Sequence, residues 1–307
     1  MFVHRRRGWE VPESQITPER FVIGRRGAIA GAGGLLIANT AASMAARAEV
    51  NPKYPAGRAI TAETDATTYN NFYEFGDDKG IYRAAQRLPV TPWHIEFAGL
   101  VEQPQTLEMA DLLKQVKLED RVYRHRCVET WAMTAPWTGF PVSALLKIAK
   151  PTSAAKYVVF QSAALPRVMP GLRASLYTWP YVEGITMQEA HNDLAFIATG
   201  MYGKELPKQD GAPLRLLTPW KYGFKAAKSI VKVSFTDTQP ETFWHALQPS
   251  EYGFWANVNP EVPHPRWSQA SEKLLGSGER VPTQIWNGYG EWVAGMYADK
   301  KSERLFT

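Results

Sequence analysis

Alternating hydrophobic and polar positions recur along the middle of the chain and predict β-strands. Residues 94–101 (HIEFAGLV) show this period of two, which is typical of a strand with one buried face. The same kind of pattern predicts five further strands, over residues 121–128, 156–162, 194–199, 214–217 and 229–235. Helical spacing appears over residues 109–116, and again over 141–149, where a proline stands at the start.

The segments between these elements are long and rich in Pro, Gly and Trp. Strands that alternate with isolated short helices and irregular loops favour a mixed α+β domain over a regular doubly wound sheet. Residues 251–307 are dense in aromatic side chains and loop-like, and we expect them to end in a strand or two around residues 292–296.

The first 48 residues have the pattern of an export signal. Arg25 and Arg26 precede a Gly- and Ala-rich apolar run over residues 27–46, which ends on the small-residue triplet 46–48 (ARA). A membrane helix is the alternative, but its glycines and polar residues make this run a weak span. A twin-arginine leader directs export of folded proteins. We therefore expect residues 1–48 to be a signal peptide, 49–68 an extended arm and 69–307 a single domain, exported to the periplasm.

The net charge of +5 comes mostly from this leader, which holds seven arginines and three glutamates. The remainder of the chain is close to neutral. Nothing in its charge therefore indicates nucleic acid or an anionic membrane surface as a partner.

The single cysteine, Cys127, cannot form an internal disulfide. It is either a small buried hydrophobe or a metal ligand. The pattern does not suit zinc or a c-type haem, because there is no second cysteine, no CxxCH and no ligand spacing among the scattered histidines. Glycine-rich phosphate loops are also absent from residues 49–307. One thiolate suffices, however, for a metal whose other ligands come from an organic cofactor.

Two groups of basic residues accompany this cysteine. Arg124 and Arg126 either stabilise the thiolate of Cys127 or form a solvated strand face. Further along, Arg215, Lys225 and Lys228 lie among Gly, Pro and aromatic residues. These three cations either converge on a phosphate or are simply solvated, and the interleaved aromatic residues favour a partly buried loop that binds an anion.

Five separated blocks, in order, resemble one family. They are residues 69–76 (YNNFYEFG), 123–129 (YRHRCVE), 210–215 (DGAPLR), 219–225 (PWKYGFK) and 251–260 (EYGFWANVNP). Together with the leader, they resemble the catalytic subunits of periplasmic protein-methionine-sulfoxide reductases. That family is a molybdopterin branch of the sulfite-oxidase fold, and the resemblance covers nearly all of the chain after the leader.

The resemblance implies one Mo-molybdopterin per chain, with Cys127 as the protein ligand of the metal. It also implies that the pterin and its phosphate are held by Asn70, Tyr73, Glu74, Ser162, Asp210, Arg215, Ala226, Ala227 and Lys228. Two of these positions depart from the family. Ser162 stands where threonine is common and keeps the hydroxyl. Asp210 stands where asparagine is frequent, so it loses a donor amide and gains a negative charge.

The activity that the resemblance implies is reduction of methionine S-oxide in oxidised periplasmic proteins, by a catalytic subunit that is a monomer. Electrons would come from a haem-binding membrane subunit that draws on the quinone pool, because the chain has no haem or flavin motif. Glu129 is the candidate for proton handling, and an ordinary ion pair with Arg124 or Arg126 is the alternative. A sulfite oxidase, or an exported binding protein without catalysis, are the alternative functions.

Overall fold

The structure, a computed structural model, describes residues 49–50, 52–300 and 302–306. These residues belong to one compact unit, Ala45–Thr307. The predicted signal peptide, residues 1–48, lies outside the described residues. No helix in the described part of the chain is both long enough and apolar enough to cross a membrane.

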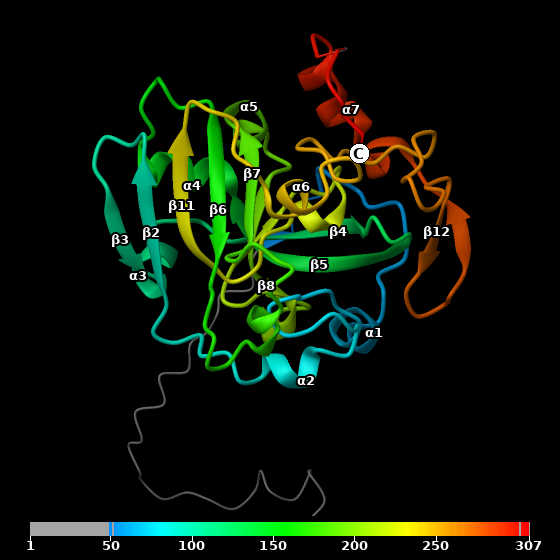
Figure 1. The fold of residues 1–307 in the computed structure, drawn as a ribbon, viewed down its shortest axis with the longest axis horizontal. Coiled ribbons are helices and arrows are strands. Elements are labelled where there is room, and N and C mark those ends of the chain that lie inside the picture. The colour runs from blue at the N-terminus through cyan, green and yellow to red at the C-terminus, as the bar shows by residue number, and fades with distance from the viewer. Residues whose placement is uncertain (1–48, 51, 301, 307) are drawn as a thin grey trace, which may run out of the picture. The chain divides into compact units, whose positions relative to one another are not determined.

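One of the two β-sheets in the described residues contains five strands in the order β3-β2-β11-β6-β7. Their bounds are β2 His94–Gly99, β3 Gln105–Glu108, β6 Tyr157–Ser162, β7 Val182–Thr186 and β11 Ile230–Thr236. β11 runs parallel to β2 and antiparallel to β6. β11 therefore lies between β2, from the start of the domain, and β6, from its middle (Figure 1).

The second sheet runs across the direction of the first (Figure 1) and carries the site described below. Its strands are β1 Glu49–Val50, β4 Glu119–Arg126, β5 Trp131–Pro141, β8 Phe196–Met201, β9 Lys204–Glu205, β10 Arg215–Leu217, β12 Ser271–Leu274 and β13 Arg280–Pro282. The whole of β4 pairs with β5. On the other side of β5, β12 pairs with its first residues and β8 with its last.

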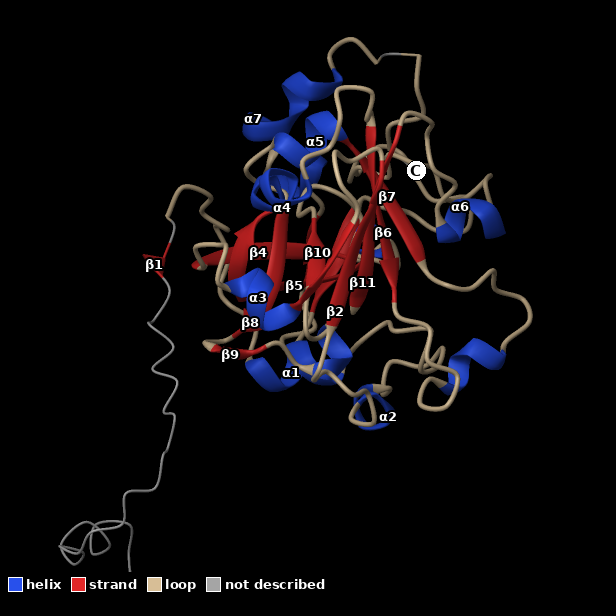
Figure 2. Cartoon of the chain, turned by 90° about the vertical axis from the view of Figure 1, so that its left-hand side faces the viewer, coloured by secondary structure: helices blue, strands red, loops and turns tan. Residues whose placement is uncertain are grey.

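Short helices flank the two sheets (Figure 2). The α-helices are α1 Glu63–Thr68, α2 Tyr82–Ala85, α3 Met109–Leu113, α4 Val142–Ala149, α5 Met187–His191, α6 Phe243–Leu247 and α7 Gly290–Val293. The 3-10 helices are η3 Pro170–Arg173, η4 Lys208–Asp210, η5 Gly223–Lys225, η6 Ile285–Gly288 and η7 Ala294–Tyr297. α4 begins directly after Pro141 and buries Leu145 and Leu146. Its apolar face packs on the common core, as helical spacing predicts.

The α+β prediction is confirmed, and all six predicted strands and both predicted helices are present within a few residues of their expected bounds. The strand expected around residues 292–296 is wrong, because this segment forms α7 and η7. Val293 and Tyr297 are both buried. Their spacing of four residues is that of one helix face, and the aromatic density of the segment conceals it from a search for alternation.

The extended arm predicted for residues 49–68 is wrong at residues 63–68, which form α1. The segment also belongs to the domain core. β1 pairs with β4, Tyr54 and Ala66 are buried, and the Tyr54 hydroxyl donates to Asp193 Oδ2 at 2.6 Å. Apolar residues are too sparse here to set a period, so the sequence pattern does not show this packing.

Candidate functional site

Cys127 lies in the turn that joins β4 to β5. Its backbone N–H donates to Trp131 O at 3.0 Å, and Thr130 N–H donates back to Cys127 O at 3.1 Å. Thr130 has a φ of 68°, the left-handed conformation that tightens this turn. The side chain of Cys127 is 4% exposed. Two long paired strands therefore hold the cysteine at one end of the second sheet.

The two arginines before Cys127 are buried and engaged elsewhere. Arg126 Nε lies 2.8 Å from Glu272 Oε2, and Arg124 donates to the carbonyl oxygens of Ala56 and Asn287. The alternative of a solvated arginine face is therefore wrong. Arg126 favours the thiolate of Cys127, as the other alternative predicts, but burial outweighs it in the metal-free chain. Burial raises the pKa of Cys127 to about 12, although Lys79 and Arg126 act to lower it.

A metal ion bonded to the sulfur would supply the missing positive charge, because coordination deprotonates a thiol outright. Within the described residues, no group of three His, Cys, Asp or Glu side chains could hold a metal. A cofactor that carries its own donor atoms would supply the other ligands of a metal at Cys127.

Glu129 is the nearest carboxylate to the cysteine, with Oε2 at 3.7 Å from Sγ. This oxygen accepts from Asn71 Nδ2 at 3.0 Å, Lys79 Nζ at 2.5 Å and Trp131 Nε1 at 3.2 Å. Burial alone would raise the pKa of Glu129, but the hydrogen bonds from Lys79 and Asn71 outweigh it and lower that pKa. Glu129 is therefore a fixed carboxylate beside the sulfur.

The ion pair expected between Glu129 and one of the two arginines is wrong, because its cationic partner is Lys79. Lys79 and Asn71 were both missed from the sequence. Asn71 lies within the block that carries the family resemblance. No signal marks Lys79, which lies in an ordinary polar turn.

A cavity of about 600 Å³ opens beside Cys127 and Glu129. It gathers residues from segments far apart in the chain. Of the residues that the family resemblance assigns to the cofactor, those lining the cavity are Asn70, Tyr73, Glu74, Ser162, Asp210, Arg215, Ala226 and Lys228. Ala227 does not line it. That residue is fully buried, and its carbonyl oxygen accepts from Leu216 N–H at 2.9 Å.

Four buried polar atoms of the lining have no hydrogen-bond partner. They are Asn70 Oδ1, Ser162 Oγ, Asp210 Oδ2 and Arg215 Nε. Each atom left without a partner costs roughly 1–3 kcal/mol, so four around one cavity are expensive unless a ligand satisfies them. Acceptors and donors both occur among them. The lining therefore fits a ligand with many hydrogen-bonding groups, such as a pterin.

The cavity wall also contains two cations, the buried Arg215 and the partly buried Lys228. Burial lowers the pKa of Arg215 to about 10, and burial together with the charge of Arg215 lowers the pKa of Lys228 to about 7. Burial raises the pKa of Asp210 to about 6, and its Oδ1 accepts from Asn70 Nδ2 at 2.7 Å. A phosphate beside the two cations would offset the cost of burying them.

Lys225 does not join these two cations, so its predicted place at the phosphate is wrong. Its ammonium group is fully buried and lies 2.5 Å from Glu183 Oε2. Lys221, in the same loop, likewise pairs with Glu189 at 2.5 Å. The loop is partly buried, as predicted, but of the three predicted cations only Arg215 and Lys228 line the cavity.

Two glycines permit close approaches in this wall. Gly211 has a φ of 109°, and a Cβ there would lie 2.9 Å from Lys228 Cγ. A Cβ on Gly223 would lie 2.5 Å from His125 Nε2. His125 lines the cavity, and burial keeps its pKa well below the usual range, so the ring is neutral. His125 has no spacing to other histidines that would mark a zinc site, so the sequence pattern does not single it out.

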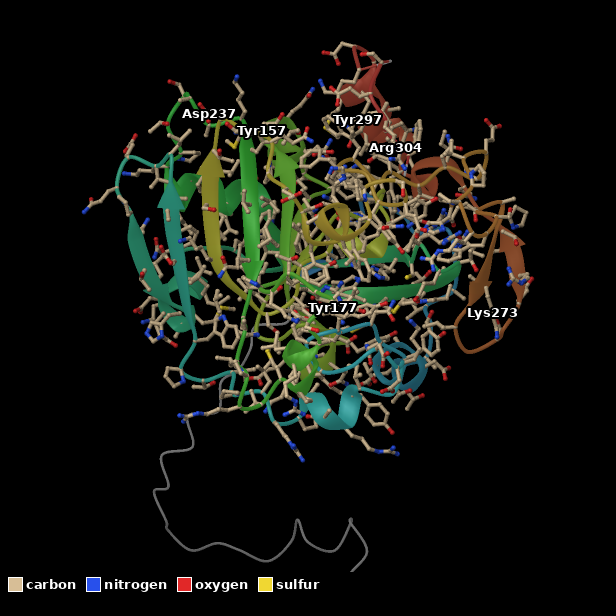
Figure 3. All side chains as sticks on the ribbon, in the orientation of Figure 1. Tyr157, Tyr177, Asp237, Lys273, Tyr297 and Arg304 are labelled. Carbon is tan, nitrogen blue, oxygen red and sulfur yellow. The ribbon has the colours of Figure 1, made fainter. Side chains whose placement is uncertain are left out.

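Aromatic side chains form another part of the wall. Tyr73 contacts both Trp244 and Tyr177, with ring centroids 5.0 and 5.8 Å apart, and Trp244 contacts Tyr252 at 5.1 Å. All four rings line the cavity, and Figure 3 labels Tyr177. The tryptophans of the lining are Trp131, Trp244 and Trp267. An aromatic wall of this kind suits an apolar group such as the methyl of a thioether.

These features define the class of protein. The family described as oxidoreductase molybdopterin binding domain matches residues 84–244, so the chain is a molybdopterin oxidoreductase with Mo-molybdopterin as its cofactor. The chain belongs, within that class, to the MsrP family of protein-methionine-sulfoxide reductase catalytic subunits. This confirms the family resemblance of the five sequence blocks.

Several relatives carry this name. The protein from Burkholderia mallei is 47% identical over 321 aligned residues, which cover 97% of this chain and 96% of that protein. The protein from Xanthomonas campestris pv. campestris is 45% identical, covering 97% of this chain and 98% of that one. The protein from Pseudomonas syringae pv. tomato is 53% identical over 78% of this chain and 73% of its own length. A solved structure, the sulfane dehydrogenase SoxCD from Paracoccus pantotrophus, is similar with a TM-score of 0.47 and 16% identity, over 85% of this chain and 68% of that chain.

Proposed function

We propose that this chain reduces methionine S-oxide in oxidised proteins to methionine. The sulfoxide loses its oxygen, takes up two electrons and two protons, and yields the thioether and one water. The observation that carries the proposal is the cavity itself, where a lone cysteine, a fixed carboxylate and an aromatic wall lie together. The names of the relatives support the choice of substrate.

Cys127 is the ligand that we assign to the molybdenum. When bound, the cofactor supplies the two-electron chemistry that removes oxygen from sulfur. Arg215 and Lys228 would hold its phosphate by charge-assisted hydrogen bonds. The partnerless atoms of Asn70 and Ser162 would bind the pterin. Asp210 Oδ2 would accept from a ring N–H, which resolves the conflict between its charge and an anionic cofactor.

Tyr73, Glu74 and Ala226 complete the set of residues that we assign to the cofactor, because all three line the same cavity. Ala227 contributes by position alone. Its backbone hydrogen bond to Leu216 holds the chain between Ala226 and Lys228 in place.

Glu129 is the residue that we assign to proton handling. Its lowered pKa keeps it a carboxylate at rest, so its role is to take up a proton from solvent and pass it on. Its carboxylate is held 3.7 Å from the cysteine sulfur by three donors, so it is fixed beside the place where the sulfoxide oxygen must be protonated. Glu129→Gln keeps the shape and most of the hydrogen bonds. We expect it to slow turnover by roughly 10²-fold, the lower range for general acid catalysis. Unchanged turnover with full cofactor content would contradict this role.

The electron donor is, in this proposal, a haem-binding membrane subunit that draws on quinone. The working site is the periplasm, reached by the twin-arginine route. The sequence of residues 1–48 supports the export route. The chain has no haem or flavin motif, which supports an external donor. Oxidised periplasmic proteins would be the substrates, and the catalytic subunit would act as a monomer.

Sulfite oxidation is the second candidate for this cavity. The aromatic wall disfavours it, because rings of this kind suit the apolar methyl group of a methionine side chain, which sulfite lacks.

Activity of the cofactor-loaded protein tests the proposal directly. A reduced viologen dye serves as electron donor for oxidised casein and for free methionine sulfoxide, and ferricyanide serves as electron acceptor for sulfite. We expect dye oxidation with casein and with free methionine sulfoxide, and no ferricyanide reduction with sulfite. Sulfite oxidation without sulfoxide reduction would overturn the proposal in favour of the second candidate. No reaction at all from the loaded protein would favour an exported binding protein.

A further inference from the structure

Two cations stand directly opposite one another at the rim of the cavity. Lys273 of β12 and Arg280 of β13 are register partners in an antiparallel pair, and both line the cavity. Like charges directly opposite on neighbouring strands destabilise the pair. An anion bound between them would remove that penalty.

Neither cation has a carboxylate partner among the residues that the structure describes. Arg280 donates only to Ser271 Oγ, at 3.2 Å. The other rim cations differ in this respect, because Arg266 pairs with Glu251 at 2.7 Å and Lys79 with Glu129 at 2.5 Å. The β12–β13 hairpin therefore leaves two positive charges facing the cavity without compensation.

The two cations also continue a row that leads to the cysteine. β12 pairs in parallel with β5, and the register partner of Lys273 is Trp131. Trp131 lines the cavity and donates to Glu129, the carboxylate beside Cys127. Arg280, Lys273 and Trp131 thus stand side by side across three strands, on one face of the sheet. Figure 3 labels Lys273 on the hairpin, away from Tyr177.

The opposite face of the same hairpin is occupied differently. Glu272, next to Lys273, is fully buried against Arg126 and Arg58. Alternation along the strand then fixes the direction of Lys273 and Arg280 toward the rim. The buried ion pairs of Glu272 fix the orientation of the hairpin, so Lys273 and Arg280 are held at the mouth of the cavity.

We propose that Lys273 and Arg280 form a subsite for an acidic side chain that lies close to the oxidised methionine in the substrate protein. The proposal rests on the proposed function and specifies which sulfoxides the enzyme reduces best. Neighbouring strands are about 4.8 Å apart, which puts the backbone of Arg280 about 10 Å from that of Trp131. An extended peptide spans this distance with about three residues. The preferred acid therefore lies about three residues from the sulfoxide.

Synthetic peptides test this subsite. Each peptide carries one methionine sulfoxide with aspartate, asparagine or lysine three residues away on both sides, and a reduced viologen dye is the donor. The readout is the ratio of kcat/KM for the aspartate peptide to that for the lysine peptide. Exposed ion pairs are individually weak, but two of them act together here, so we expect a ratio of about tenfold at low salt. In 0.5 M NaCl the ratio falls toward one, because exposed charges are screened.

Charge-reversal variants test whether Lys273 and Arg280 cause the preference for the aspartate peptide. K273E/R280E is expected to bring the ratio below one, because the subsite now repels aspartate. The matched control is R87E/K147E, which makes the same change of net charge at two exposed residues that do not line the cavity. The control keeps the wild-type ratio. A ratio is used because it is internal to each variant and does not depend on how much cofactor the variant holds.

Two results would overturn the subsite. One is a wild-type ratio close to one at low salt, and the other is a wild-type ratio that K273E/R280E leaves unchanged. In both cases the peptides are still reduced, so the proposed function stands while the subsite fails. A loaded enzyme that reduces none of the peptides contradicts the proposed function, and the subsite with it.

Discussion

The buried ion pair behind the cysteine turn makes the sharpest prediction about stability. Arg126 and Glu272 are both fully buried, with Nε and Oε2 2.8 Å apart, and Arg58 also pairs with Glu272. Arg126 Nη2 donates to Gln269 Oε1 at 2.7 Å. The amide of Gln269 in turn donates to Val128 O at 2.9 Å. The pair therefore holds the turn next to Cys127 and joins β12 to β4.

Glu272→Gln removes the negative charge and keeps the shape. Breaking a buried pair by neutralising one partner costs about 3–5 kcal/mol, because the other charge stays buried. Arg126 keeps its hydrogen bond to Gln269, so we expect the lower end, about 3 kcal/mol. For a domain of this size, 1 kcal/mol shifts Tm by about 2–4 °C. The expected loss is therefore about 6–12 °C.

Thermal unfolding of the cofactor-free protein, followed by tryptophan fluorescence, measures this loss. The control is Glu279→Gln, which removes the same charge from an exposed position between β12 and β13. A surface change of this kind stays within about 0.5 kcal/mol, or about 2 °C. A Tm for Glu272→Gln that matches the control would refute the reasoning, because the pair would then contribute nothing to the fold.

Three further predictions concern the cofactor wall. Gly211→Ala places a Cβ 2.9 Å from Lys228 Cγ at a φ of 109°, so we expect a loss of about 1–3 kcal/mol in chemical denaturation and less bound cofactor. Arg215→Gln removes a charge-assisted hydrogen bond, and we expect cofactor affinity to fall by roughly tenfold to a hundredfold in a titration of the cofactor-free protein. Burial raises the pKa of Glu74 to about 7, above its value of 4.5 when unfolded. The folded state then holds the extra proton, so the cofactor-free protein should lose up to about 3 kcal/mol as pH rises from about 4.5 to 7, and Glu74→Gln should flatten this dependence in denaturation curves. A steep slope that survives Glu74→Gln would contradict the assignment to this carboxyl.

The strands that the sequence predicts well are those with one buried face. β2 has alternating burial over its first four residues, and β6 over all six. β5 was missed for a physical reason. Its first five residues are all buried, since both faces of the sheet are covered there, and a strand of that kind has no alternation to detect. The strand that forms one side of the cysteine turn was therefore invisible to the pattern.

The site was predictable where residue chemistry was unusual and unpredictable where only position mattered. A lone cysteine beside arginines drew attention to Cys127, although those arginines turned out to serve the fold. Arg215 and Lys228 were singled out by their buried loop. Lys225, three residues before Lys228, looked equivalent and points to Glu183 instead. Lys79 lies 50 residues from Glu129, and only the tertiary fold brings the two together.

Molybdenum analysis of the purified protein, beside its Cys127→Ser variant, tests the central claim most directly. We expect about one molybdenum per chain in the parent protein. Its molybdenum X-ray absorption should contain a sulfur ligand that is lost in the variant. Protein made with cofactor synthesis intact that holds no molybdenum would contradict the claim, and so would a variant whose metal keeps the same number of sulfur ligands.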